Sequence, residues 1–135
     1  MSINGILVLV SIWAGVIIFF SAIIAPTVFK TLDEKSAGVF LRAFFPKYYL
    51  FAIVIGLLAL ALIMVFDINI NGVLYISIVS MIILSIISRI MIPAINNARD
   101  LGEEGKTKFN RLHTISVLLN VITLVIGLFF IYGAI

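Results

Sequence analysis

The sequence predicts an all-α integral membrane protein, a four-helix bundle that forms a single membrane domain over residues 1–135. Two observations carry this prediction. First, 64% of the residues are hydrophobic and only 11% are charged, whereas soluble domains are about 45–50% apolar and about 25% charged. Second, apolar stretches of about 20 residues, the length of helix that crosses a hydrocarbon core of about 30 Å, alternate with short polar connections.

The four spans are expected at residues 3–25, 48–66, 72–92 and 112–135. Pro26 closes the first span and Pro93 the third, because proline lacks the N–H that a continuing helix needs. The spans are rich in Ile and Val, which also favour strands. Only helices and closed barrels satisfy their backbone groups in lipid, and the polar–apolar alternation of barrel strands is missing here. The start of the chain has no basic residue, so no cleavable signal peptide is expected.

Basic residues are confined to two of the three connections and their flanks, and residues 67–71 contain none. The positive-inside rule therefore places both basic connections in the cytoplasm and both termini outside. This predicts a multi-pass protein of the bacterial inner membrane with periplasmic termini. The net charge of +3 indicates contact with anionic lipid, and no nucleic-acid partner is expected. The basic residues are Lys30, Lys35, Arg42, Lys47, Arg89, Arg99, Lys106, Lys108 and Arg111.

The first basic connection has the pattern of a short amphipathic helix at the cytoplasmic interface. Thr31 and Glu34 form a capping box at its start, and Pro46 is expected to end it. A simple tether and a gating or binding role both fit this helix. The apolar residues on its face are Leu32, Ala37, Phe40, Leu41 and Phe44.

In the second connection, the third helix is expected to continue past Pro93 and to stop at Gly102. The fourth helix is expected to begin near residues 104–106. Its mixed charges are typical of a solvated face.

Several residues of the spans have expected packing roles. Trp13 falls near the middle of the bilayer, where it is expected to pack against other helices. Tyr48 and Tyr49 are expected at the inner membrane interface, as aromatic residues favour that depth. A small-residue face on the first helix is expected to allow close helix packing; it consists of Ser11, Gly15 and Ala22.

The fourth span carries a polar stripe at helical spacing, and such a stripe in lipid should face other helices or a cavity. Asn110 and Lys106 extend it into the cytoplasm. The term polar stripe is used below for the four residues within the span, which are His113, Ser116, Asn120 and Thr123. The serines of the third span, Ser77, Ser80 and Ser88, are expected to lie opposite it.

Arginines supply the charge beside this stripe. Arg89 lies about one turn inside the third span, either as a functional residue or with its side chain reaching toward the headgroups. Arg89 and Arg99 would make the cytoplasmic mouth attractive to anions. The predicted binding site therefore comprises His113, Ser116, Asn120, Arg89, Arg99 and Asn110.

Chemistry beyond binding has few candidates. The chain has no cysteine and one histidine, so no metal site is predicted, since zinc needs three or four ligands. His113 could provide one axial ligand to a haem, or a structural hydrogen bond to a neighbouring helix. Haem is the one cofactor considered, and no catalytic residue is predicted, because no nucleotide-binding, zinc-protease or serine-hydrolase motif is present.

Short motifs along the whole chain resemble a known family. Trp13-Ala14-Gly15, Ala25-Pro26 with Phe29, Ala37-Gly38 and Tyr48 carry the resemblance in the first half. A run of the form F-x-x-L-H-x-x-S-x-x-x-N, from Phe109 to Asn120, carries it in the second half. The chain resembles a bacterial family of unknown function that is related to eukaryotic transmembrane protein 205. The resemblance implies a four-helix membrane protein.

A weaker likeness, through Trp13, Gly15 and the apolar run that follows, points to haem-binding porphyrinogen oxidases and to copper-resistance membrane proteins. Those oxidases carry a histidine shortly before the tryptophan, and residues 6–12 contain none.

Three functions follow as hypotheses. The first is a non-enzymatic membrane protein that binds or transports a small solute or lipid through a polar site between the third and fourth helices. The second is a redox protein that handles haem or porphyrin with His113 as ligand. The third is a structural subunit of a larger membrane complex, in which the small-residue face of the first helix would serve contacts with a partner or a second copy.

Overall fold

A computed structural model describes residues 3–135, and this part of the chain contains helices and no strand. Four helical segments are long and apolar enough to cross a membrane, which confirms the predicted fold class. The elements are α1 (Asn4–Phe19), the π-helical turn η1 (Phe20–Ile24), α2 (Ala25–Thr31), α3 (Glu34–Val65), α4 (Gly72–Asp100), the 3₁₀ turn η2 (Gly102–Gly105) and α5 (Lys106–Ala134).

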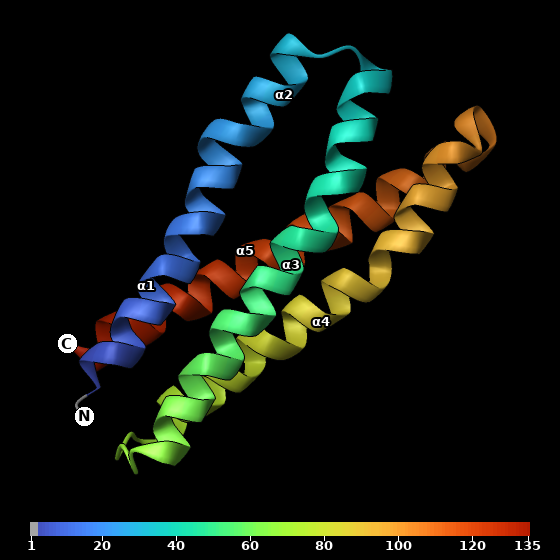
Figure 1. Cartoon of the computed structure of the whole chain (residues 1–135). Helices are drawn as coiled ribbons and strands as arrows, with labels where there is room; N and C mark the ends of the chain where they lie inside the picture. Colours follow the sequence, from blue (N-terminus) through green and yellow to red (C-terminus); the bar gives the residue numbers. More distant parts are fainter. Residues whose placement is uncertain (1–2) are drawn as a thin grey trace.

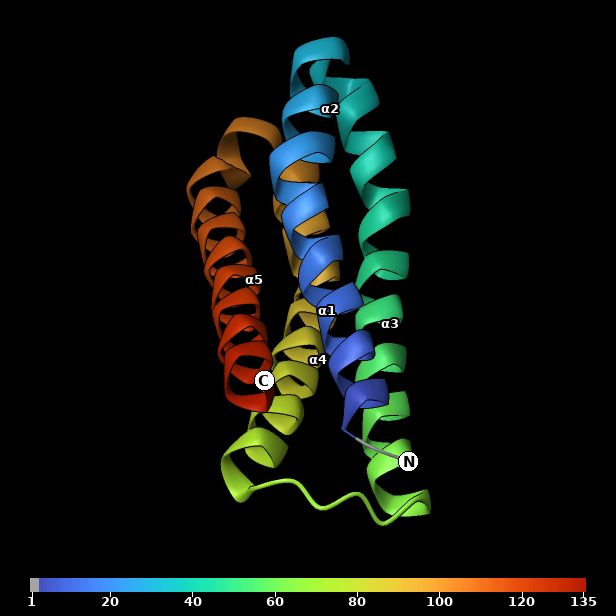
Figure 2. The same cartoon turned by 90° about the vertical axis from the view of Figure 1, so that its left-hand side faces the viewer.

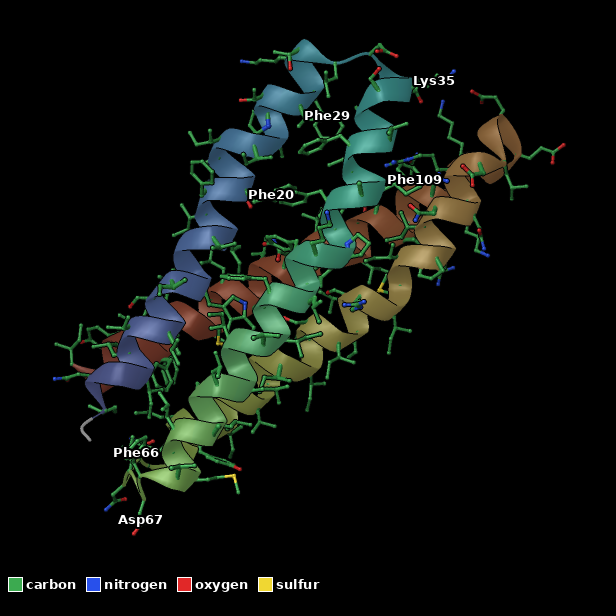
Figure 3. All side chains as sticks on the ribbon, viewed as in Figure 1. Phe20, Phe29, Lys35, Phe66, Asp67 and Phe109 are labelled. Carbon is green, nitrogen blue, oxygen red and sulfur yellow. The ribbon has the colours of Figure 1, made fainter. Side chains whose placement is uncertain are left out.

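The bundle has two different ends. Both termini lie at the same end as the turn formed by residues 66–71, and the two basic connections lie at the other (Figures 1 and 2). Figure 3 shows Lys35 at the basic end and Phe66 and Asp67 at the opposite one. We call the two parts of the bundle the basic half and the terminal half. In the terminal half, α1 packs on both α3 and α5, and α4 packs on the same two helices.

Tight packing in the terminal half centres on Trp13, which is 1% exposed. A side-chain carbon on Gly56 of α3 would overlap Ile82 of α4 and lie 2.9 Å from the Trp13 ring. Gly127 of α5 is similarly close to Met81, whose methyl carbon would lie 3.0 Å from an added Cβ. Gly56 therefore lets α3 approach the indole and α4, and Gly127 lets α5 approach α4. Trp13 is the packing residue that the sequence predicted.

The first helix does not end at Pro26, so that prediction is wrong. The chain remains helical through η1 and α2 as far as Thr31. Proline removes one hydrogen bond and crowds the preceding turn. The wider π-helical turn, residues 20–24, comes directly before Pro26 and takes up this mismatch.

The separate interface helix between the first two spans is also absent. Its residues are helical, but α3 runs without a break through Pro46 to Val65. The helix cap is Asp33, whose carboxylate accepts a hydrogen bond from the Ser36 N–H at 3.3 Å. Hydrogen bonds from Ser36 lower the pKa of the Asp33 carboxyl. Thr31 is not the cap, because it lies in the last turn of α2 and its hydroxyl donates to the Thr27 carbonyl.

The second connection follows the sequence more closely. α4 passes through Pro93, so the expectation that this proline stops the third span is wrong, while the expected continuation of the helix beyond it is confirmed. α4 ends at Asp100, and α5 begins at Lys106. Gly102 has a φ of +62°, which confirms it as the helix stop. An added Cβ on Gly105 would overlap the Ala98 carbonyl oxygen, so two glycines close this turn.

The small-residue face of the first helical segment points out of the bundle. Ser11 and Gly15 of α1 and Ala22 of η1 are all exposed, and nothing lies within 4 Å of a Cβ built on Gly15. The buried face of α1 consists of larger side chains instead, because Gly56 leaves space for Trp13. Those buried residues are Ile6, Val10, Trp13, Ala14 and Ile17.

Candidate functional site

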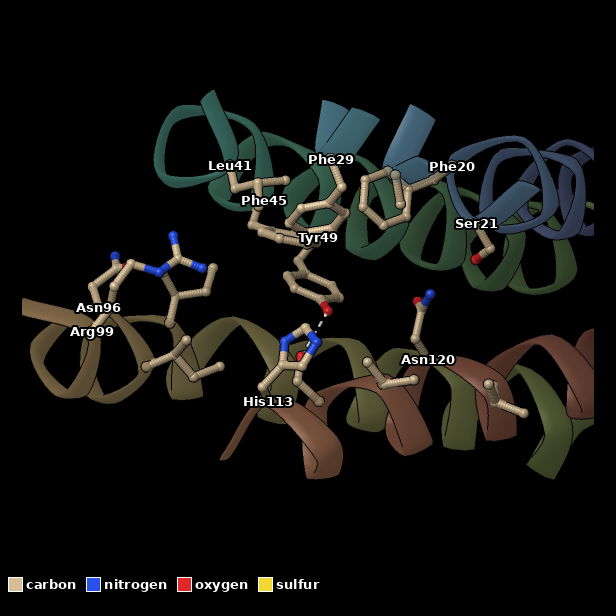
Figure 4. Close-up of a pocket in the computed structure, with 16 residues that line it drawn as sticks. Phe20, Ser21, Phe29, Leu41, Phe45, Tyr49, Asn96, Arg99, His113 and Asn120 are labelled. Carbon is tan, nitrogen blue, oxygen red and sulfur yellow. Dashed lines mark hydrogen bonds between the residues drawn. The ribbon is translucent and has the colours of Figure 1, made fainter. Parts of the chain in front are cut away.

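The candidate site is a cavity of about 270 Å³ in the basic half of the bundle. It forms because α1 packs on both α3 and α5, whereas no Cα atom of η1 or α2 lies within 8 Å of a Cα atom of α5 in the described chain. All four helical segments border the cavity (Figure 4). Exposed residues border it on both sides of the gap between α2 and α5, namely Phe29 on α2 and Val117 and Val121 on α5. The cavity therefore opens sideways, toward the region that lipid would occupy.

One side of the cavity is an aromatic wall. Phe20 of η1 stacks on Phe44 of α3 with 5.1 Å between ring centroids, and it meets Phe45 edge-on at 5.3 Å. Phe45 in turn stacks on Tyr49, one helical turn further along α3, at 5.9 Å. These contacts join η1 to α3, so the first span is held to α3 on this side while it diverges from α5. We call Phe20, Phe45 and Tyr49 the aromatic wall.

The opposite side carries the polar stripe of α5. The Tyr48 hydroxyl donates to the Asn120 side-chain oxygen at 3.1 Å. The Tyr49 hydroxyl and the Ser116 hydroxyl lie 3.3 Å apart, and either can donate. These two hydrogen bonds connect α3 to α5 across the bundle and pair the polar groups of partly buried side chains. Figure 4 also shows the Ser21 hydroxyl of η1 and the Asn120 amide pointing toward each other across the cavity.

Tyr48 and Tyr49 were expected at the membrane interface, and that prediction is wrong. Both are buried in the bundle, where they are the partners of the polar stripe. Their position could have been found from spacing, because Tyr48 lies seven residues from both Leu41 and Ile55, which are buried on the same face of α3.

The serines of α4 are not the partners. Ser77 donates to the Val73 carbonyl of its own helix, and Ser77, Ser80 and Ser88 are not among the residues that border the cavity. Thr123, the deepest residue of the stripe, is buried and bonds the Leu119 carbonyl of its own helix. The polar contacts thus run between α3 and α5 rather than between the third and fourth helices, as the sequence suggested.

The edge of the cavity nearest the basic connections is formed by Arg99 and Asn96 of α4 (Figure 4). The guanidinium carbon of Arg99 lies 4.9 Å from the centroid of the Phe109 ring, a cation–π geometry. Phe109 stacks on His113 with 5.7 Å between centroids and 10° between planes. Arg99, Phe109 and His113 thus form a continuous row, and its two ends, Arg99 and His113, border the cavity.

The structure brings only part of the predicted site together. His113, Ser116, Asn120 and Arg99 border the cavity. Asn110 borders a neighbouring hollow that shares Arg99. Arg89 lies elsewhere, because its guanidinium donates to the Pro46 carbonyl at 3.3 Å and so connects α4 to α3. Among the cavity residues that the sequence did not predict are Phe20, Ser21, Phe45, Tyr49 and Asn96.

The described residues contain no group of three or more His, Cys, Asp or Glu side chains that could hold a metal ion. The polar groups of the cavity are hydroxyls, amides, one imidazole and one guanidinium. These are groups that bind and orient a molecule through hydrogen bonds and positive charge.

Four apolar helices of membrane-crossing length, arranged around a partly polar cavity that opens sideways, define a multi-pass membrane protein. Residues 8–104 match the family described as a domain of unknown function, DUF4149, and the chain belongs to this family. The matched region holds the aromatic wall and Arg99, and it ends before α5, which carries the polar stripe.

The chain is also similar to an uncharacterized protein of Aquifex aeolicus (strain VF5). The two are 30% identical over 124 residues, which cover 90% of this chain and 88% of that protein. No solved structure matches the chain. The comparisons therefore place this protein in a bacterial family of unknown function.

Proposed function

We propose that this protein binds a small solute or lipid in the cavity of the basic half and catalyses no reaction. The cavity itself carries the proposal, because it combines an aromatic wall, a short row of polar groups and an opening toward the bilayer. Ligand sites are mostly apolar hollows of about 300–1,000 Å³ with a few placed polar groups. The volume of about 270 Å³ suits one small molecule, or the polar end of a larger one.

Photolabelling tests this proposal directly. The full chain in nanodiscs of phosphatidylcholine would be exposed to a medium-chain alcohol that carries a diazirine, and labelled peptides would be mapped by mass spectrometry. We expect labels to concentrate on the residues that border the cavity. Ser21→Phe fills the cavity from η1 and should remove most of this labelling.

Ser11→Phe is the matched control, because Ser11 is an exposed serine of the same span that does not border the cavity. It should leave the labelling pattern unchanged. Labels spread evenly over the lipid-facing surface, with no effect of Ser21→Phe, would contradict the proposal.

The same proposal includes three further points. The protein transports the bound molecule, it lies in the bacterial inner membrane, and both of its termini are periplasmic. The gathering of the basic connections at one end supports this orientation, since such residues favour the cytoplasmic side. Kinship with eukaryotic transmembrane protein 205 is also proposed, on the motifs described above. Equal solute flux into proteoliposomes for the wild type and a His113→Ala, Asn120→Ala double variant would argue against transport through this cavity.

Haem binding by His113 is a second candidate function. It is supported by the position of the imidazole at the cavity, with one ring face against Phe109. An absorption spectrum of the purified protein after haem supplementation is the test. A Soret band that disappears in His113→Ala would support this function, and a spectrum without that band would end it.

A structural role in a larger assembly is the third candidate, and the outward face of α1 supports it. Ser11, Gly15 and Ala22 leave a shallow surface on which another transmembrane helix could pack closely. Purification in a gentle detergent tests this role: a monomer without any partner would count against it, and against a homo-oligomer.

A further inference from the structure

Arg99 is a half-buried cation without an ion pair in the described part of the chain. Its sequence neighbour Asp100 is held by Arg42, with 2.6 Å between the charged groups. Glu34 borders two hollows next to Arg99 but forms no ion pair with it. The guanidinium thus retains hydrogen-bond donors for an external anion, and guanidinium groups bind phosphate and carboxylate with paired hydrogen bonds.

The fold holds Arg99 in place without neutralising it. On one side the guanidinium lies over the Phe109 ring. Gly38 of α3 is also close, because an added Cβ there would lie 3.5 Å from an Arg99 nitrogen. A guanidinium that packs on an aromatic ring and close to a neighbouring helix is restrained in position, so little conformational freedom is lost when an anion binds.

The depth of these groups matches the layers of a bilayer. Arg99 lies about 40 Å along α4 from Gly72, at about 1.5 Å per residue. Asn120 lies about 21 Å along α5 from its end at Ala134. A hydrocarbon core is about 30 Å thick. With the terminal-half ends of the helices at one boundary of this core, Asn120 lies at hydrocarbon depth. The Arg99 backbone lies about 10 Å past the opposite boundary, and its long side chain, which is directed back toward the start of α4, reaches the headgroup layer.

We propose that the cavity binds an anionic amphiphile, with its phosphate or carboxylate at Arg99 and its chain leaving between α2 and α5. This inference rests on the proposed function and names the ligand class. The anion meets Arg99 and the Asn96 amide at the edge of the cavity, and the first part of the chain lies along the aromatic wall. The remainder of the chain passes Val117 and Val121 into the surrounding lipid, because about 270 Å³ is too little space for a whole membrane lipid.

Binding to the detergent-purified full chain, measured by native mass spectrometry, tests the role of charge. The probes are dodecyl phosphate, dodecanol and inorganic phosphate. We expect dodecyl phosphate to bind about tenfold more tightly than dodecanol, because a hydrogen bond to a charged partner contributes this much or more. Arg99→Gln should remove the difference, and Arg99→Lys, which keeps the charge, should retain most of it. Arg111→Gln is the matched control, an exposed arginine away from the cavity that should have no effect.

The outcomes separate this inference from the proposed function. Equal binding of dodecyl phosphate and dodecanol, or equal binding in wild type and Arg99→Gln, would overturn the anion site and leave the cavity as a ligand site. If inorganic phosphate binds as tightly as dodecyl phosphate, the ligand is a free anion from solution. That result would overturn the proposal that the ligand carries an alkyl chain. No binding of either chain-bearing probe would overturn both proposals.

The sideways route has its own test on α5. Val117→Trp places a large side chain at the opening and should weaken dodecyl phosphate binding about tenfold or more. Val125→Trp changes a more exposed valine about two turns away, outside the cavity, and should not weaken it. Equal binding by the two variants would overturn passage between α2 and α5.

Discussion

At the scale of single residues, the basic half depends on two hydrogen bonds between side chains of α3 and α5. Tyr48 pairs with Asn120, and Tyr49 with Ser116. Their partners on α5 border a cavity at hydrocarbon depth, where an unpaired hydroxyl or amide would find little water. The pairs therefore fix the distance between α3 and α5 and keep the polar stripe directed inward.

Tyr48→Phe removes one of these hydrogen bonds while it keeps the buried ring. We expect a loss of about 0.5–1.5 kcal/mol in the free energy of unfolding, since Asn120 loses its donor. Unfolding in a denaturing detergent would measure it. Tyr132→Phe is the control, because Tyr132 is 83% exposed and should change stability little. Equal losses for the two variants would show that the Tyr48 hydroxyl contributes nothing specific.

At the scale of helices, the terminal half is held by close contacts at glycines. Gly56 is the point where α1, α3 and α4 approach one another, with Trp13 and Ile82 on either side. No side chain larger than hydrogen fits there without a shift of a ring and a packed isoleucine. The contact between these helices is therefore set by backbone proximity, as is common between helices in membranes.

Gly56→Ala should destabilise the fold by about 1–3 kcal/mol, because an overpacked contact forces neighbouring helices apart. The free energy of unfolding measures this effect. Gly15→Ala is the matched control in the neighbouring helix, where nothing lies within 4 Å of the added carbon. It should change stability by less than about 1 kcal/mol. A larger loss for Gly15→Ala than for Gly56→Ala would contradict the packing described here.

Features set by local chemistry were predictable from the sequence. The four apolar stretches of membrane-crossing length correspond to four helical segments. Gly102 follows the end of α4, because glycine has no side chain and adopts the positive φ that ends the helix. Pro26 and Pro46 were misleading, because lipid penalises a broken helix more than it penalises one missing hydrogen bond. Both prolines accordingly lie inside continuous helical segments.

The partners of the polar stripe were harder to predict. Helical spacing predicts that the polar stripe faces into the bundle. Which helix lies opposite the stripe depends on how the helices are arranged around the bundle. Adjacent serines on α4 were a reasonable expectation, whereas the actual partners, Tyr48 and Tyr49, lie on α3, diagonally opposite α5. Arg89 and Arg99 looked alike in sequence, and only the geometry separates a helix-bridging arginine from one at the cavity.

At the scale of the whole molecule, the bundle is closed in one half and open in the other. In the terminal half, α1 fills the space between α3 and α5. In the basic half, η1 and α2 lie farther from α5, and the cavity occupies the space between them. The basic connections lie at the open end (Figure 2). The proposed site is therefore on the side where the charge pattern predicts the cytoplasm.

Cysteine labelling tests that orientation, since the chain has no cysteine of its own. Glu104→Cys lies in η2 of the basic half, and Asn69→Cys lies in the turn of the terminal half; both positions are exposed. In intact cells, a membrane-impermeant maleimide should label the cysteine at position 69 and not that at position 104. The reverse pattern would invert the topology. Position 105 is unsuitable, because Gly105 has no space for a side chain.

The burial of Trp13 has a practical consequence. It is the sole tryptophan of the chain, so the intrinsic fluorescence of the protein reports on one place only, the junction of α1, α3 and α4. An indole this well shielded should emit at short wavelength and resist quenchers dissolved in water or in lipid. A ligand that merely occupies the cavity should leave that emission unchanged. A spectral shift on binding would thus reveal that the closed half of the bundle also moves.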